Sequence, residues 1–251
     1  MEEEMKFALV YEDHDILVVD KPAHLPTVPL KDDPVEKLTL LGLVSQAYPE
    51  VRQIAGHNLW EGGVLHRLDT ATSGLVVIAR TKEAYASLQA LQKADLFFKE
   101  YQAISSGPRV PDLPGFPAYP YEDPYAAKGK EVAIGSLFRR FGENRREVRP
   151  VLADSPKHLL DKTTGTWYMT KVTYAGSGPG GREHFTCRLS SGFRHQVRVH
   201  LAWSGWPLEG DEVYHGRSAH NLGLRAVAVE LVHPITAKPL EIRIQSQEEG
   251  E

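Results

Sequence analysis

One aspartate in this chain stands where a catalytic carboxylate would be expected. Asp69 ends the string His-Arg-Leu-Asp at residues 66–69, which follows the glycine pair 62–63 and precedes a Thr-Ser-Gly turn and the apolar run 75–79. An ionised carboxylate can attack carbon as a nucleophile or remove a proton as a general base. Active-site acids often lie on loops held by a rigid strand. A lone Asp-x-x-Thr more often caps a helix or turn, but the longer string favours a catalytic loop.

Two further strings complete a recognisable set. Residues 99–101 read Lys-Glu-Tyr, and residues 192–200 read Gly-Phe-Arg-His-Gln-Val-Arg-Val-His. With residues 66–74, the chain resembles the RluA-type RNA pseudouridine synthases, whose signature is H-R-L-D-x-x-T-S-G, a Lys-x-Tyr strand, and G-x-x-H-Q-[IVL]-R-x-H. Residues 11–22 and 205–211 also resemble that family, so the resemblance covers nearly the whole chain.

The resemblance implies a single α+β catalytic domain over residues 1–251, with a long, mixed, mostly antiparallel sheet flanked by helices. Members often carry a small RNA-binding domain upstream of the catalytic one. Only about seven residues precede the first expected strand here, so we expect no such accessory domain and RNA binding by the catalytic domain itself. The implied reaction isomerises specific uridines of ribosomal or transfer RNA to pseudouridine. It needs no metal, redox cofactor or obligatory protein partner.

Three residues match the family's catalytic positions. Asp69 is the implied carboxylate, which could attack ribose C1′ as a glycosidase nucleophile does or remove the C2′ proton; the sequence leaves both routes open. Arg198 matches the arginine that forms a salt bridge with that aspartate, and a nearby guanidinium keeps a buried carboxylate charged. Tyr101 matches the tyrosine that packs against the target uracil and helps to remove a proton late in the reaction.

Four further residues are implied to bind the substrate. Arg67 matches the arginine that fills the space left by the flipped uridine or grips its phosphates. Flipping costs a few kcal/mol of stacking and pairing, so a planar cation is useful there. His195 and Gln196 belong to the third string and His66 to the first. For His66, an ordinary buried and hydrogen-bonded histidine is an equally good interpretation.

The chain departs from the family's usual sequence at two positions. Phe193 stands where many members have arginine, so either Arg194 replaces that arginine one position later, or the arginine is missing and Phe193 packs. Arg225 stands where Leu-His-Ala is often found. An RNA contact inferred for position 193 is therefore in doubt.

Composition narrows the class of protein. A chain of 251 residues with 41% hydrophobic residues can bury a substantial core. The lone Cys187 excludes an internal disulfide and a cysteine-based zinc cluster, which fits a reducing, cytosolic setting. The start, residues 1–6, is acidic rather than basic, and no apolar run approaches the ~20 residues of a membrane helix. We therefore expect a soluble, cytoplasmic protein.

The net charge of −4 gives no sign of nucleic-acid binding, but local clusters decide such binding. Residues 137–149 hold five arginines interleaved with two phenylalanines. Two interpretations stay open for this segment. It is either a solvated hairpin tip, as charge runs often are, or a surface that contacts phosphate.

Two other functions compete with the synthase. A relative that binds RNA but has lost catalysis is disfavoured by the intact set of Asp69, Tyr101 and Arg198. A metal-dependent hydrolase is suggested by the eleven histidines, yet none has the H-E-x-x-H arrangement. His195 and His200 are five residues apart, on poorly matched faces of a helix, which favours structural roles over a zinc site.

Periodicity places these strings on expected elements. Alternating and apolar runs predict strands at 7–11, 16–20, 74–79, 96–104, 132–134, 167–175, 183–189, 224–232 and 240–244. Helical spacing predicts helices at 38–47, 82–93 and 194–204. Six of the 17 prolines lie within residues 108–124, which predicts an irregular loop or insertion. Strands outnumber helices, so the residues independently favour an α+β fold.

Overall fold

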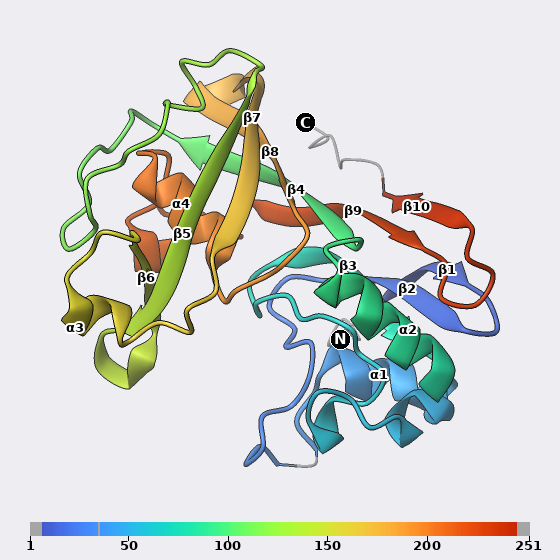
Figure 1. Ribbon diagram of the computed structural model, residues 1–251. Coiled ribbons are helices and arrows are strands. Elements are labelled where there is room, and N and C mark those ends of the chain that lie inside the picture. The colour runs from blue at the N-terminus through green and yellow to red at the C-terminus, as the bar shows by residue number, and fades with distance from the viewer. Residues whose placement is uncertain (1–6, 35, 245–251) are drawn as a thin grey trace. The chain divides into compact units, whose positions relative to one another are not determined.

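The computed structural model describes residues 7–34 and 36–244. The acidic start at residues 1–6 lies outside this range. Close contacts along the chain group it into two compact units, one formed by residues 1–99 with 225–251 and the other by residues 100–224. The chain passes between the units in two strands, β4 (Phe98–Ser106) and β9 (Leu224–Val232), whose paths can be followed in Figure 1.

The first unit has a small mixed sheet in the order β1-β2-β3-β9, with β10 paired to β9. Its strands are β1 (Ala8–Glu12), β2 (Ile16–Lys21), β3 (Ser73–Ala79), β9 and β10 (Pro239–Arg243). The strands β1, β2 and β3 pair antiparallel, whereas β3 and β9 pair parallel. Every residue of β3 from Leu75 to Ala79 has no exposed surface, because its neighbours cover both faces. The expected buried central strand is confirmed.

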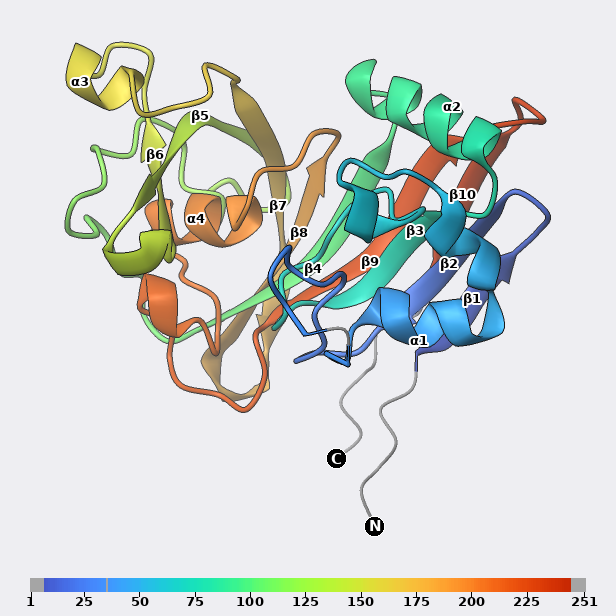
Figure 2. The same cartoon turned by 90° about the horizontal axis from the view of Figure 1, so that it is seen from below.

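Helix α2 (Lys82–Lys93) covers part of this sheet, as Figures 1 and 2 show. The Thr81 hydroxyl accepts a hydrogen bond from the Ala84 N–H, which is the usual way to cap the first turn. Tyr85 and Leu88 follow at helical spacing, and they are buried against strand residues such as Val77. Helix α1 (Leu40–Ala47) and the 3₁₀ helices η1 (Pro49–Gln53) and η2 (Leu59–Glu61) fill the connection from β2 to β3.

The second unit has strands in the order β4-β8-β7-β5-β6. They are β4, β5 (Glu131–Phe141), β6 (Glu147–Val151), β7 (Tyr168–Gly178) and β8 (Arg182–Leu189). The pairs β5–β6, β5–β7 and β7–β8 are antiparallel, so β5 and β6 form a hairpin. The short helical segments are η3 (Glu143–Arg145), α3 (Lys157–Leu160), η4 (Pro179–Gly181) and η5 (Glu212–Tyr214). Residues 108–124 form no strand or helix, as their prolines predicted.

Helix α4 (Gln196–Trp203) lies beside β6 and β7 in the second unit, and Figure 2 shows it next to these strands. All eight of its residues are buried. Val199 and Ala202 join Phe138, Val148 and Tyr214 in an apolar cluster. Because the helix is covered all round, its polar side chains need partners inside the protein.

The expected α+β fold is confirmed, since the described residues of each unit form mostly antiparallel strand pairs with few helices. The expected strand at 132–134 was too short, because the structure extends it to Phe141 and pairs it with β6. The expected helix at 194–204 starts late, since His195 has a left-handed φ of 58° and ends the preceding turn. Among the described residues no helix is both long and apolar enough to cross a bilayer.

Candidate active site

The segment before Asp69 lies against β3 through backbone hydrogen bonds. The Ala79 N–H donates to the Gly63 carbonyl (2.8 Å), the Leu65 N–H donates to the Val77 carbonyl (3.0 Å), and Val64 bridges to Ile78. A Cβ on Gly63 would lie only 2.1 Å from the Ala79 carbonyl oxygen, so glycine is required for this approach. The rigid strand therefore fixes where the loop at 66–69 begins.

The loop is fastened again just before the aspartate. Leu68 is buried, and its N–H donates to the Thr27 hydroxyl (3.1 Å), while that hydroxyl donates to the Leu68 carbonyl (2.9 Å). After it, the Thr72 N–H donates to the Asp69 carbonyl (3.0 Å) and closes a turn. Asp69 is half-buried between these two fixed points. Its backbone has little freedom, as a reacting group needs.

Lys21 lies beneath this loop with no exposed surface. Its ammonium donates to the carbonyls of Pro22 (2.9 Å), Leu25 (2.7 Å) and Thr70 (3.3 Å). Burial lowers the pKa of Lys21 to about 8, while the negative charges of Asp69 and Asp20 act in the opposite direction. Within the first unit, Lys21 is therefore a positive charge near the candidate carboxylate. Sequence reasoning missed it, although it lies at the end of the matching string 11–22.

Arg67 is held at the surface by a buried acid. Its Nη1 lies 2.9 Å from Glu61 Oε1, and the side chains are 57% and 6% exposed. The second Glu61 oxygen accepts from the Asn58 N–H (3.2 Å) in a capping box on η2. Arg67 thus presents an exposed guanidinium beside the loop, as a contact to RNA would require. The role of Glu61 could not be predicted from the sequence, because carboxylates near a glycine pair are common.

His66 points inward. Its Nε2 accepts from the Val77 N–H (3.3 Å), and its ring lies 5.4 Å from the Phe97 ring. Burial, and then the charge of Lys99, hold the pKa of His66 well below its usual range. The imidazole is therefore neutral, with its proton on Nδ1. This geometry favours the buried, hydrogen-bonded interpretation, and the substrate contact stays a prediction.

In the second unit, Arg198 forms a buried ion pair. Its Nε and Nη2 donate to the two Asp211 oxygens at 2.7 and 2.8 Å, and the side chains are 8% and 0% exposed. Asp211 also accepts from the N–H groups of Val213 and Tyr214, and the Tyr214 ring lies 5.3 Å from the Arg198 guanidinium. Asp211 thus fixes the guanidinium in two-pronged geometry. Asp69 belongs to the other unit, so its pairing with Arg198 stays a prediction.

Tyr101 lies on β4, where alternate residues are buried; it is 7% exposed and shares its face with Ala103 and Ser105. His195 Nδ1 lies 2.9 Å from the Tyr214 hydroxyl, which also accepts from the Val148 N–H. The hydroxyl thus joins the His195 ring to the backbone of β6. This contact places a hydrogen-bonded histidine at the start of α4, and a contact of His195 with substrate stays a prediction.

The Gln196 side chain joins three parts of the second unit. Its oxygen accepts from the Phe193 N–H (2.9 Å), and its nitrogen donates to the Met169 carbonyl and the Thr170 hydroxyl, both at 3.0 Å. Both amide protons are therefore used within the fold, so a contact with substrate, still a prediction, has only the oxygen left. His200 bonds Thr170 (2.9 Å) and Ser136 (3.1 Å), and burial lowers its pKa to about 3, which agrees with a structural role.

Comparison with known proteins decides the family. Residues 15–203, well over half of the chain, match the family model described as RNA pseudouridylate synthase. The chain belongs to this family. The resemblance seen in the sequence is therefore confirmed.

Two curated members of the pseudouridylate synthase family show how far the likeness extends. Ribosomal large subunit pseudouridine synthase D of Vibrio parahaemolyticus is 30% identical over 252 residues, which cover 93% of this chain and 65% of the relative. The protein of the same name from Haemophilus influenzae is 28% identical over 256 residues, which cover 95% of this chain and 67% of that relative. The chain thus spans about 65% of the length of the first of these relatives.

Solved structures of the family share the fold. Human RNA pseudouridylate synthase domain containing 1 superimposes with a TM-score of 0.65 at 20% identity, covering 98% of this chain and 86% of that protein. Human RNA pseudouridylate synthase domain containing 4 superimposes with a TM-score of 0.63 at 17% identity, covering 95% of this chain and 88% of that protein. At these identities the likeness supports the fold alone.

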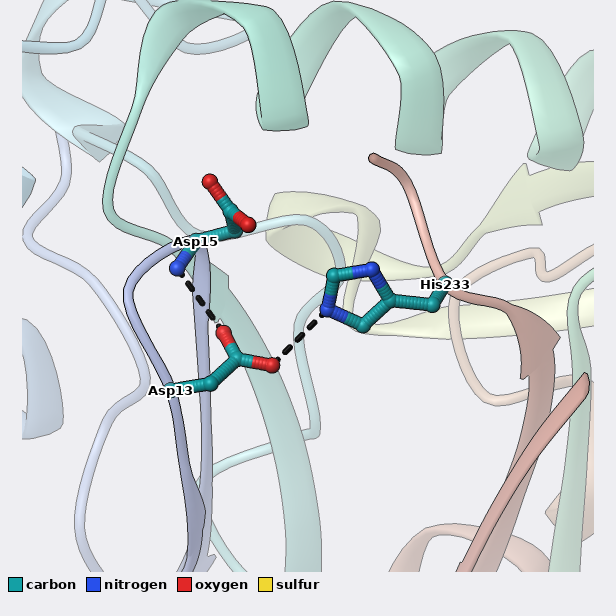
Figure 3. Close-up of side chains that lie close together, drawn as sticks. All are labelled: Asp13, Asp15 and His233. Atoms are coloured by element: carbon teal, nitrogen blue, oxygen red, sulfur yellow. Dashed lines mark hydrogen bonds and ion pairs between the residues drawn. The ribbon is translucent and has the colours of Figure 1, made fainter. Parts of the chain in front are cut away.

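One cluster in this pseudouridylate synthase family member has the composition of a metal site. Asp13, Asp15 and His233 lie together in the first unit, and Figure 3 shows them. Asp13 Oδ1 accepts from the N–H groups of Asp15 and Ile16, both at 2.8 Å. Its Oδ2 accepts from the Tyr11 hydroxyl (2.6 Å) and His233 Nε2 (2.8 Å). Four donors occupy the Asp13 oxygens, which accounts for the cluster as a structural network.

We expect Asp13→Asn to lower stability at neutral pH by about 1–2 kcal/mol. Burial alone would raise the pKa of Asp13, but bonds from Tyr11, the Ile16 and Asp15 N–H groups and His233 lower it to about 2. A lowered folded pKa gives stability that is present above the unfolded value of about 3.9 and is lost as pH falls to about 2. Urea unfolding across this range should therefore show the deficit of the variant shrinking. A constant deficit would contradict the assignment.

We expect Lys21→Met to lose about 2–4 kcal/mol at neutral pH, because three carbonyls near the loop lose a donor. The folded pKa of about 8 lies below the unfolded value of about 10.4, so wild-type stability should rise further with pH between them. The variant should lack that rise. Urea midpoints at several pH values test this, with Lys82→Met at an exposed position as control. Equal midpoints for Lys21→Met and wild type would refute the role.

The two departures from the family's sequence also have structural explanations. Phe193 packs, since its ring stacks on Phe138 at 5.1 Å, while Arg194 extends one position later toward a hairpin. The structure thus shows that Phe193 packs, and the replacement of the family's arginine by Arg194 stays a prediction. Arg225 forms an ion pair with Asp20 across β3, where Gly74 approaches the Ala226 backbone too closely for a Cβ.

Proposed function

We propose that this protein is an RNA pseudouridine synthase that isomerises specific uridines of ribosomal or transfer RNA, with Asp69 as the catalytic carboxylate. The observation that carries the proposal is the loop at 66–69. In a chain of this family, it holds Asp69 between the Leu68–Thr27 bonds and the Thr72 turn, with buried Lys21 nearby. The names of the curated relatives support ribosomal RNA of the large subunit as the first substrate to test.

The reaction breaks the bond from ribose C1′ to uracil N1 and forms one from C1′ to C5. The uracil rotates between these steps, the C5 proton leaves, and N1 gains a proton, so atoms balance without a cofactor. Asp69 acts at the sugar, either as nucleophile on C1′ or as base toward C2′. Both routes need an ionised carboxylate. The buried ammonium of Lys21 places a positive charge in the neighbourhood of that carboxylate.

The remaining residues act on the base and the backbone. Arg67, exposed and held by Glu61, supports the flipped nucleotide or contacts its phosphate. Tyr101, on the buried face of β4, packs against the uracil. Arg198, fixed by Asp211, pairs with Asp69 when the site is assembled. We propose that the described units work as one catalytic domain and that the protein acts in the cytoplasm.

Release of tritium from RNA labelled at uracil C5 tests the proposal. Purified protein should release tritium from a transcript of large-subunit ribosomal RNA or from transfer RNA, because C5 loses its proton in the product. Mapping pseudouridines in cellular RNA with and without the protein would then identify the uridine. Binding of these RNAs without tritium release would favour the inactive relative instead.

A further inference from the structure

The β5–β6 hairpin places like charges opposite each other. Arg139 and Arg149 are direct cross-strand partners, an arrangement that is normally unfavourable. Both guanidinium groups lie over the Phe141 ring, at 4.8 and 3.5 Å from its centre, and Arg149 also pairs with Glu147. Partial burial, then the charge of Arg149, lower the pKa of Arg139. A bound anion would relieve this repulsion.

The tip of the hairpin carries two more arginines. Arg145 and Arg146 are exposed, as is Arg140 on β5. The backbone there is unusual, because Asn144 and Arg145 have left-handed φ values of 53° and 55°. Asn adopts this conformation readily, whereas for Arg145 it is uncommon and indicates that neighbouring groups hold the backbone there.

Arg194 supplies part of that constraint. Its Nη1 donates to the Arg145 carbonyl (3.0 Å) and its Nη2 to the Arg146 carbonyl (3.2 Å). The preceding residue anchors it, since the Phe193 ring stacks on Phe138 at an interplanar angle of 14°. The start of α4 is thus connected through Arg194 to the backbone of both tip arginines.

We propose that residues 139–149 form a phosphate-binding surface for RNA, and that Arg194 is a positioning residue that orders its tip. Five arginines against two glutamates lie within residues 137–149, in a chain whose net charge is −4, so the positive charge is concentrated locally. Guanidinium groups match phosphate oxygens in charge and geometry. That the occupant is RNA rests on the proposed function.

The test is the salt dependence of binding to a transcript of large-subunit ribosomal RNA, between about 50 and 200 mM KCl. Each phosphate contact contributes roughly 0.7–0.9 to the slope of log affinity against log salt concentration. The double variant Arg145→Ala/Arg146→Ala should therefore weaken binding and flatten the slope by about 1.4–1.8. The control Lys130→Ala removes one exposed charge of the same unit outside the hairpin and should leave the slope unchanged.

Arg194→Ala should flatten the slope nearly as much as the double variant, with an unchanged urea midpoint because its side chain is exposed. Adding Arg194→Ala to the double variant should then change little, since its effect acts through the two tip residues. Arg194→Lys should recover part of the slope. A further additive loss in the triple variant, or no effect of Arg194→Ala alone, would overturn the positioning role.

The experiments test the phosphate-binding surface and the synthase activity independently of each other. Tritium release by wild type with a wild-type slope for Arg145→Ala/Arg146→Ala would overturn the phosphate-binding surface and leave the synthase activity standing. Flattened slopes without any tritium release would support the surface and overturn the activity. Binding to the transcript with no salt dependence would also overturn the surface.

Discussion

Asp69→Asn is expected to abolish pseudouridine formation while the protein still folds and binds RNA. The substitution keeps the size of the side chain and removes the negative charge that either route needs. It leaves the backbone bond from Thr72 to the Asp69 carbonyl and the Leu68–Thr27 bonds in place. Loss of a group that bonds covalently or abstracts a proton commonly costs many orders of magnitude in rate. Tritium release in single-turnover conditions, together with RNA affinity and the urea midpoint, measures all three properties.

Asp154→Asn is the matched control, because Asp154 is exposed and lies in the second unit. It should behave as wild type in each assay. Turnover by Asp69→Asn within a few fold of wild type would rule Asp69 out as the catalytic carboxylate. Loss of folding by Asp69→Asn would instead show that the stability of the loop depends on the negative charge of Asp69, which acts on the buried Lys21.

The strands and helices that a single local pattern specifies were predictable from sequence. The apolar run of β3 and the 3.6-residue spacing of α2 each report on one element alone, and both elements were placed to within one residue. The hairpin partner β6 was missed, because its Glu-Val-Arg-Pro-Val sequence reads as charged surface. Its pairing with β5 depends on the core beneath, where Val148 is buried with Phe138.

In the candidate site, too, residues within a local motif could be predicted, whereas residues defined by distant contacts could not. Asp69 and Arg67 could be found because they stand within a long and specific string. Lys21, Glu61 and Asp211 could not, because their importance lies in which distant groups they contact. The Lys21 ammonium donates to the carbonyl of Thr70, which is 49 residues away in the sequence. Asp211 accepts from Arg198, which is 13 residues away. A string of residues reports identity and spacing, whereas the partners of a buried charge are set by how the chain folds back on itself.

Arg198→Met is expected to cost about 3–5 kcal/mol of stability, because it leaves the buried Asp211 carboxylate without its ion-pair partner. Arg198→Lys should recover part of this, since an ammonium keeps the charge but cannot reproduce the two bonds from Nε and Nη2. Asp211→Asn should also destabilise the protein. The double variant Arg198→Met/Asp211→Asn should lose less than the sum of the single variants, because the pair is already broken in each.

The rate of tritium release by the variants distinguishes the structural role of Arg198 from its proposed role as the partner of Asp69. At a temperature where all variants are folded, Asp211→Asn keeps the guanidinium and should retain much of the tritium release. Arg198→Met should lose far more, and its residual activity should shift toward higher pH, because a carboxylate without its cation takes up a proton more readily. Equal losses of rate in Arg198→Met and Asp211→Asn, with unchanged pH profiles, would mean that Arg198 serves only the core of the second unit. In that case Lys21 would be the cation on which the Asp69 carboxylate depends.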